Sequence, residues 1–202
     1  MEIDIVGEDQ VTQAIIERLL TEYRQDIIIK NRLPARGGQI QKMAPIYNRL
    51  DSPIFLLTDL DSYPCPPALI ASWFGEENIS ENFIFRIAQE EAETWLMADR
   101  QGFSKWLHVD VSLIPEPTIV DRKKKTTEII FPIKPSLFLM LNIASQSKNK
   151  KLKEDLMPLS GARKGPAYNS AIIPYIENIW NVENASTNSF SLTKAIERLQ
   201  NF

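Results

Sequence analysis

Strand and helix patterns alternate along the first hundred residues, and this order constrains the fold more than any other feature of the chain. Short apolar runs indicate strands near Ile3–Val6, Ile27–Lys30, Ile54–Thr58 and Phe83–Ile87. Apolar side chains at helical spacing predict helices near Val11–Tyr23, Ile40–Leu50, Ala68–Trp73 and Glu90–Ala98. Parallel strands need crossovers of helical length, so we predict an α/β fold with a mainly parallel sheet and helices on both faces.

The second half of the chain is predicted to form a C-terminal helical flank on this sheet. Helices are expected near Ser136–Ala144, Tyr168–Trp180 and Leu192–Gln200, with a polar loop or short helix at Asn142–Lys153. Because no separate core is evident, residues 1–202 are expected to form a single domain, with an α/β core over 1–110 and a basic, helical extension over 111–202. The alternative is that the second half forms a small second lobe. The tryptophans fall in apolar helical patterns and are expected in the core: Trp73, Trp95, Trp106 and Trp180.

The composition is that of a soluble globular protein, and it excludes several classes of function. No apolar stretch approaches the ~20 residues of a membrane span, and a single cysteine, Cys65, cannot form an internal disulfide, so a cytoplasmic location is expected. The stiff, proline-rich loop around Cys65 favours a structural thiol over a nucleophile. His108 is the only histidine, which excludes Ser-His-Asp catalysis and histidine-rich zinc sites. No Walker sequence is present, which excludes ATP hydrolysis by P-loop chemistry.

Acidic side chains follow two of the predicted strands directly. Asp59 and Asp61 are two residues apart after Ile54–Thr58, so in an extended segment they point to the same side. Glu8 follows the first strand in an equivalent position, and ligands of open α/β sheets bind at such strand ends. Adjacent carboxylates repel each other unless a cation lies between them, and hard oxygen ligands suit Mg2+ or Mn2+. The alternative is that Glu8 and Asp9 only stabilise the N-terminus of the following helix.

A third acidic cluster follows the strand near Phe83–Ile87. Glu91 and Glu93 share a face only if this segment is still extended, whereas on a helix Glu90 and Glu93 would be neighbours. Acids at three strand ends can assemble one or two metal ions about 4 Å apart, the arrangement used for phosphodiester cleavage. The alternative is a charged first helical turn that faces solvent.

Charge is distributed unevenly along the chain. Residues 1–100 have nine Lys/Arg against seventeen Asp/Glu, a balance of −8, whereas residues 120–165 have eleven against four, a balance of +7. A segregated basic block is typical of phosphate binding, and DNA is favoured over RNA as its partner. The alternative is a solvated helix face or loop. The candidate contacts to nucleic acid are Arg36, Arg122, Lys123, Lys124, Lys125, Arg163 and Lys164.

Several of these motifs resemble the TOPRIM domain of topoisomerases, bacterial primases and nucleases of the overcoming-lysogenization-defect class. The shared features are a glutamate after the first strand, Glu8, and an Asp-x-Asp pair after a later strand, Asp59 and Asp61. A bacterial TOPRIM-like family classed as a domain of unknown function is more similar still, over nearly the whole chain. The segments that carry this second resemblance are Val6–Asp9, Arg36–Gly38, Leu57–Asp61, Cys65–Pro67, Arg86–Ala88, Glu91–Asp99, Gly165–Asn169 and Ser189–Leu192.

The resemblance implies a TOPRIM/Rossmann-like fold and a magnesium-dependent nuclease site. Glu8, Asp59 and Asp61 would hold the metal, and Glu8 would also be a candidate general acid or base. Glu91 and Glu93 would be ligands of a second metal or would orient water. The family usually has Asp-Pro-Lys where this chain has Asp121, Arg122 and Lys123, so the proline is replaced by Arg122. By this match, Lys123 would stabilise charge on the scissile phosphate. TOPRIM nucleases often act with an ATPase partner in phage defence or repair, and a homodimer is compatible with the resemblance.

Two other functions are consistent with the same residues. An apolar strand followed by Asp-x-Asp is also the first motif of haloacid-dehalogenase-like phosphatases, with Asp59 as the nucleophile. Here, however, Tyr63 stands where that family has Thr or Val, and the motif does not follow the first strand. The second alternative is a non-catalytic TOPRIM-like subunit that binds nucleic acid or regulates a partner. Metal-dependent cleavage that is lost in Asp59→Asn would separate the nuclease from the non-catalytic subunit. The phosphatase instead predicts activity on small phosphate esters and a covalent aspartyl-phosphate.

Overall fold

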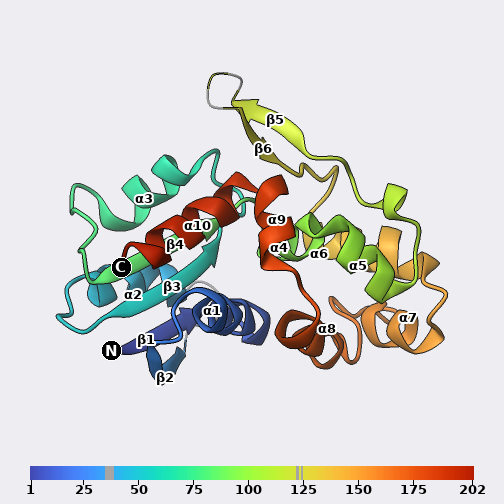
Figure 1. Cartoon of the computed structure of the whole chain (residues 1–202), viewed down its shortest axis with the longest axis horizontal. Helices are drawn as coiled ribbons and strands as arrows, with labels where there is room; N and C mark the ends of the chain where they lie inside the picture. Colours follow the sequence, from blue (N-terminus) through green and yellow to red (C-terminus); the bar gives the residue numbers. More distant parts are fainter. Residues whose placement is uncertain (35–38, 122, 124) are drawn as a thin grey trace. The chain divides into compact units, whose positions relative to one another are not determined.

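The computed structural model describes residues 1–34, 39–121, 123 and 125–202 (Figure 1). These residues form two compact units. The sheet unit comprises Met1–Glu90 and Lys194–Phe202, and the helical unit comprises Glu91–Thr193. The sequence predicted a change of character near residue 110, whereas the division between the units falls between Glu90 and Glu91.

The sheet unit contains a four-stranded, fully parallel sheet with the strand order β2-β1-β3-β4. The prediction of an α/β fold with a parallel sheet is confirmed. The strands are β1 (Glu2–Gly7), β2 (Ile28–Pro34), β3 (Ile54–Asp59) and β4 (Phe83–Ala88), and each overlaps a predicted strand. β3 lies between β1 and β4 and is buried except at its last residue, which explains its continuous apolar sequence.

Helices cover both faces of this sheet, because alternate strand residues are buried on opposite sides. One face packs against α2 (Gln39–Asn48) and α3 (Pro66–Phe74) through a cluster that includes Val6, Leu56 and Phe85, which are aligned on adjacent strands. The helix α1 (Gln10–Tyr23) packs against β1 and β3. Its buried residues, among them Ile15 and Leu19, have the predicted helical spacing.

The helical unit consists of short helices and one β-hairpin. Its α-helices are α4 (Glu93–Ala98), α5 (Arg100–Leu107), α6 (Pro135–Phe138), α7 (Lys150–Leu156), α8 (Tyr168–Asn178) and α9 (Val182–Asn188). The run after α6 continues as a π-helix over Leu139–Ile143 and a 3-10 turn over Ala144–Gln146; a further 3-10 turn spans Val111–Leu113. The hairpin pairs β5 (Thr118–Asp121) with β6 (Thr126–Glu128). The final helix, α10 (Phe190–Gln200), begins in this unit and ends in the sheet unit.

The structure corrects the prediction of a helix over Glu90–Ala98. Glu90 has a φ of +61°, which no α-helix accommodates, so α4 begins at Glu93. Asp99 then ends α4 and caps α5, an element that was not predicted, by accepting a hydrogen bond from the Gly102 amide. A side chain on Gly102 would collide with this carboxylate. The hairpin β5–β6 and α9 were not predicted either, because their sequences are short and largely polar.

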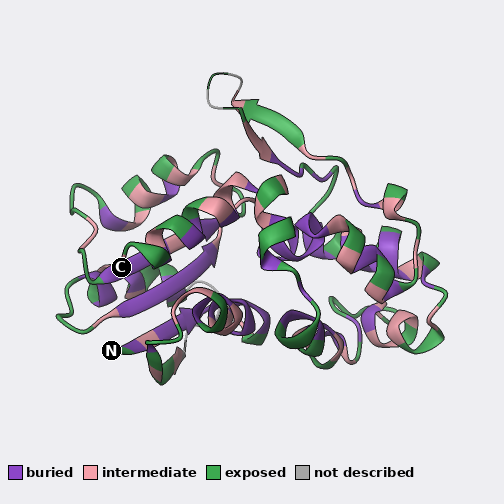
Figure 2. Cartoon of the chain, in the orientation of Figure 1, coloured by how far each residue is buried: buried purple, intermediate pink, exposed green. Residues whose placement is uncertain are grey.

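Burial divides the tryptophans into two pairs. Trp95 and Trp180 are fully buried, as predicted, and α4 is buried along its whole length (Figure 2). Trp73 and Trp106 are only partly buried, so their assignment to the core is wrong in part. Cys65 is exposed and precedes the first turn of α3. Among the described residues, no helix has the length and apolar character required to span a membrane.

Candidate metal centre

The carboxyl ends of β3 and β4 remain joined beyond the last strand residues. The Leu60 amide donates a hydrogen bond to the Ala88 carbonyl, and the Asp61 amide donates to the Glu90 carbonyl, both at 3.0 Å. Asp61 and Glu90 have φ values of +48° and +61°, a region that few residues other than glycine and aspartate or asparagine occupy readily. The backbone therefore turns sharply at the point where the acidic side chains leave the sheet.

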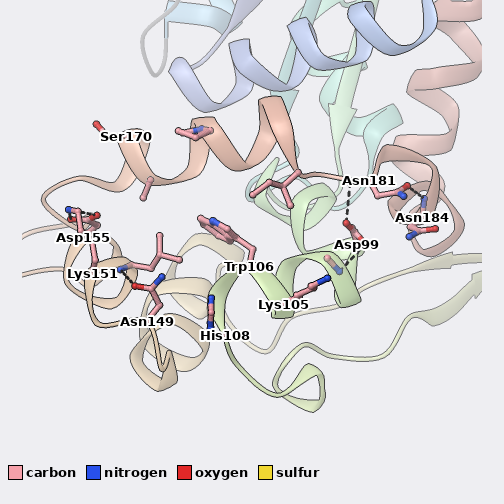
Figure 3. Close-up of a pocket in the computed structure, with 15 residues that line it drawn as sticks. Asp99, Lys105, Trp106, His108, Asn149, Lys151, Asp155, Ser170, Asn181 and Asn184 are labelled. Carbon is pink, nitrogen blue, oxygen red and sulfur yellow. Dashed lines mark hydrogen bonds and ion pairs between the residues drawn. The ribbon is translucent and has the colours of Figure 1, made fainter.

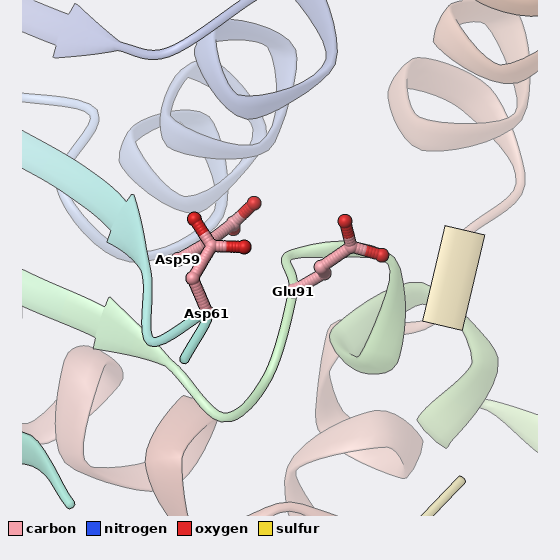
Figure 4. A group of neighbouring side chains, drawn as sticks. All are labelled: Asp59, Asp61 and Glu91. Atoms are coloured by element: carbon pink, nitrogen blue, oxygen red, sulfur yellow. The ribbon is translucent and has the colours of Figure 1, made fainter. Parts of the chain in front are cut away.

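Three carboxylates meet at this edge. One oxygen from each of Asp59, Asp61 and Glu91 lies within 4.8 Å of the others, and we call this group the acidic triad (Figure 4). Glu91 is the first residue of the helical unit, but it follows directly on Glu90, whose carbonyl is bonded to Asp61. Chain continuity thus explains why it lies beside the aspartates. Three carboxylates this close are mutually repulsive, and they could hold a metal ion.

Glu8 lies at the same end of the sheet but is engaged differently. Its Oε1 accepts hydrogen bonds from the Thr58 hydroxyl and, at 3.1 Å, from the Asp59 amide, so it is bonded to the end of β3. Burial raises the pKa of Glu8; these two hydrogen bonds offset part of the effect, and the charges of Asp61 and Asp9 add to it. Glu8 is not a member of the acidic triad, which contains three of the five predicted metal ligands: Asp59, Asp61 and Glu91.

Asp9, the residue after Glu8, caps the N-terminus of α1. Asp9 accepts hydrogen bonds from the Val11 and Thr12 amides, and the Thr12 hydroxyl and the Asp9 backbone complete a capping box at the start of α1. The alternative interpretation, in which Glu8 and Asp9 both stabilise the helix N-terminus, is therefore confirmed for Asp9. Glu8 remains available for chemistry at the strand end.

Glu91 is also bound within the helical unit. Its Oε1 forms an ion pair with Lys134 Nζ at 2.9 Å, and its Oε2 accepts a hydrogen bond from the Ser136 amide at 2.7 Å. Ser136 lies in the first turn of α6, where a carboxylate is favourable. Only 7% of the Glu91 side chain is exposed, so this carboxylate would carry a large desolvation cost without such partners.

Glu93 lies apart from the acidic triad. It is buried in the first turn of α4, where its Oε1 accepts a hydrogen bond from the Tyr168 hydroxyl at 2.8 Å. Lys164 Nζ lies 4.7 Å from the centre of the Tyr168 ring, a cation–π contact. The structure therefore gives Glu93 a partner in α8, and Glu93 is not among the three residues of the acidic triad.

Four of the seven predicted basic residues lie on exposed segments of the helical unit. Lys123 and Lys125 lie in the turn between β5 and β6, and the Lys123 amide donates to Asp121 Oδ1. Arg163 and Lys164 are exposed just before α8. Three further candidates, Arg36, Arg122 and Lys124, lie outside the described residues.

Three residues with direct roles around these carboxylates were not predicted. Thr58 could have been identified, because it is the polar residue that ends an apolar strand next to the aspartates. Lys134 and Tyr168 are 43 and 75 residues from their carboxylate partners Glu91 and Glu93, and no local pattern connects them. Comparison of the chain with protein families, with curated proteins and with solved structures finds no match.

Proposed function

We propose that this protein is a TOPRIM-like, metal-dependent nuclease that cleaves phosphodiester bonds in DNA or RNA. The observation that carries the proposal is the acidic triad, in which Asp59, Asp61 and Glu91 bring three carboxylate oxygens within 4.8 Å of one another at the carboxyl ends of adjacent parallel strands. Such strand ends are where open α/β sheets bind their ligands.

The donor set fits a small, hard divalent cation. All three groups are carboxylates, the ligands preferred by Mg2+ and Mn2+, and no histidine or thiolate is among them. Asp59, Asp61 and Glu91 would hold the ion. When bound, it would neutralise charge on a phosphate and favour deprotonation of water at neutral pH.

The chain itself supplies a candidate for proton transfer. Glu8 is fixed by Thr58 and the Asp59 amide, and its raised pKa lies closer to neutrality than that of an ordinary carboxyl group. A carboxylate with these properties can accept a proton from water or return one to the leaving oxygen. The exposed Lys123, Lys125 and Arg163 are suited to contacts with backbone phosphates, which position the strand without reading its sequence.

We further propose that the nuclease acts on DNA rather than RNA and works with an ATPase partner in phage defence or repair. This part rests on the resemblance to TOPRIM nucleases, and the basic block over residues 120–165 supports only nucleic acid in general as the partner. A homodimer and a cytoplasmic location are compatible with it.

One observation favours a second function, a non-catalytic subunit. Both oxygens of Glu91 already have partners within the helical unit, Lys134 and the Ser136 amide. In that case the triad would join structural elements, and its acids would contribute nothing to cleavage.

The test is cleavage of circular and linear DNA and of RNA in the presence of Mg2+ or Mn2+. We expect wild type to cleave and the Glu8→Gln/Asp59→Asn variant to lose at least about 100-fold of the rate, because a metal ligand and a proton-transfer group are both removed. Asp51→Asn is the matched control, since Asp51 is an exposed acid that precedes β3 rather than following it.

The outcomes separate the three functions. Equal cleavage by wild type and the double variant would overturn the nuclease proposal. Binding of Mg2+ without cleavage by any form would favour the non-catalytic subunit. Hydrolysis of a small phosphate ester, with a covalent aspartyl-phosphate at Asp59, would instead identify a phosphatase.

A further inference from the structure

The helical unit contains a pocket that the proposed cleavage site does not use. Its volume is about 910 Å3, near the upper end of the range for small-molecule sites, and its lining comes from α5, α7, α8 and the start of α9 (Figure 3). All the lining residues lie between Asp99 and Asn184, within one compact unit. The pocket therefore belongs to a self-contained part of the molecule.

An aromatic ring forms one wall. Trp106 is partly exposed and lines the pocket, and its indole stacks on Tyr175 with ring centres 4.6 Å apart and an angle of 29° between the planes. Phe103 contacts both rings edge-on. These contacts hold the indole in place, so a planar ligand would meet a preformed surface rather than a mobile side chain.

The two carboxylates of the wall, Asp99 and Asp155, already have partners. Asp99 is buried, and its two oxygens accept hydrogen bonds from the Gly102 and Asn181 amides at 3.2 and 3.1 Å. Asp155 forms an ion pair with Lys151 at 3.0 Å. Both carboxylates therefore already have partners within the helical unit.

The remaining polar groups of the rim are mainly donors. Asn149 and Asn181 use their side-chain oxygens to cap α7 and α9, which leaves their amide NH2 groups for a ligand. Lys105 and His108 also line the pocket, and neither forms an ion pair with any residue that the structure describes. A ligand with several acceptors or a negative charge would match these donors.

From the stacked indole and the donor-rich rim we infer that this pocket binds an unpaired nucleotide, with its base on Trp106 and its phosphate near Lys105. A base has a planar face for stacking and a phosphate has only acceptors, so one ligand satisfies both features. A base inside a duplex has no free face to stack. The inference deepens the proposed function, on which it rests, by assigning single-stranded nucleic acid as the form that is bound.

The test is binding without metal, so that cleavage plays no part. A fluorescently labelled oligothymidylate is titrated with protein in EDTA, and binding is followed by fluorescence anisotropy. We expect Trp106→Leu to weaken binding about tenfold through loss of stacking. Lys105→Gln should weaken it about threefold and reduce the salt dependence by about one phosphate contact.

Lys150→Gln is the matched control, because Lys150 is exposed on α7 beside Lys151 and does not line the pocket. It removes the same charge and should change binding less than Lys105→Gln. Trp106 packs on Tyr175, so thermal unfolding is used to check that the Trp106→Leu variant is folded. If that variant does not fold, Lys105→Gln still tests the pocket.

Two further arms identify the form of the nucleotide. Competition by thymidine monophosphate at concentrations that displace the oligonucleotide would assign the pocket to free nucleotides, and failure to compete would assign it to a strand. Equal binding by wild type, Lys105→Gln and folded Trp106→Leu would overturn the inference, as would duplex bound as tightly as single strand. Loss of binding in these variants without cleavage by wild type would retain the pocket and reject the nuclease.

Discussion

The sheet unit and the helical unit differ in the kind of polar side chain that they bury. Among the described residues, the buried polar side chains of the sheet unit are uncharged: Thr12, Asn48 and Thr58. The helical unit instead buries four carboxylates: Glu91, Glu93, Asp99 and Glu128. Each of the four accepts at least one hydrogen bond within its own unit.

The difference follows from how each unit forms its core. A parallel sheet satisfies its own backbone groups, so apolar side chains can fill both of its faces. Short helices leave many terminal N–H groups unpaired, and buried carboxylates such as Asp99 and Glu91 accept hydrogen bonds from them. The buried acids of the helical unit thus bind groups of their own unit, whereas Asp59 and Asp61 remain accessible at the end of β3.

The largest effect is expected from Asp99→Ala. Asp99 binds the Gly102 amide of α5 and the Asn181 amide at the start of α9, so its loss leaves two backbone donors without partners. We expect the free energy of unfolding to fall by about 2–4 kcal/mol, measured by urea denaturation. Asp110→Ala is the control, since Asp110 caps only an exposed 3-10 turn through Ser112. Similar losses in both variants would contradict a special role for buried carboxylates.

A pH-dependent effect is expected from Glu128. It accepts hydrogen bonds from the Ser189 hydroxyl and the Ser191 amide, yet burial raises its pKa above the ordinary value of 4.5. The folded state then binds this proton more tightly than the unfolded chain, so stability falls as the pH rises from 4.5 to the raised pKa. Above that pKa the loss is constant.

Glu128→Gln removes this loss, because glutamine resembles the protonated acid. We therefore expect the stability of the variant relative to wild type to increase with pH, as measured by urea denaturation at pH values from 4 to 7. A difference that stays constant over this range would show that the charge of Glu128 costs nothing in the folded state.

The smallest effect is expected around Glu91, which is both a buried acid of the helical unit and a member of the acidic triad. Lys134→Met removes the ammonium partner of Glu91, but half of the Lys134 side chain is exposed, so the metal-free protein should lose only about 0.5–1 kcal/mol. Since the ammonium competes with a cation for the same carboxylate, Mg2+ should raise the melting temperature more in this variant than in wild type.

Lys151→Met provides the comparison for Lys134→Met. It removes the ion pair with Asp155, in which 81% of the lysine side chain is exposed, and it leaves the acidic triad untouched. Its response to Mg2+ should equal that of wild type. An unchanged response in Lys134→Met as well would place Glu91 among the structural acids alone.

Much of the sheet unit could be predicted from the sequence. Runs such as Ile54–Thr58 are apolar because both faces of a parallel strand are buried, and the α/β order followed from their spacing. Asp59 and Asp61 could be singled out because strand ends are defined by the chain itself. The start of α4 could not, since the positive φ of Glu90 left no trace in a sequence rich in helix-forming glutamates.

The helical unit could be predicted only in part. Asp99 and Gly102 gave no sign of a helix boundary, because an aspartate followed by a glycine three residues later is common in loops as well. Trp106 was assigned to the core on its helical spacing, but the same spacing fits a side chain that is half-buried beside a pocket. Periodicity identifies the face of a helix and not what covers that face.

The amino-acid sequence by itself therefore determined the parallel sheet and the positions of the acids at its strand ends, because both depend on patterns within a few residues. Only the tertiary structure decided which acids meet. Glu91 joined Asp59 and Asp61 while Glu93 turned to Tyr168 and Glu8 to Thr58. These contacts depend on hydrogen bonds between residues tens of positions apart. Such bonds matter most in the folded chain, because a buried polar group without a partner carries a large desolvation cost.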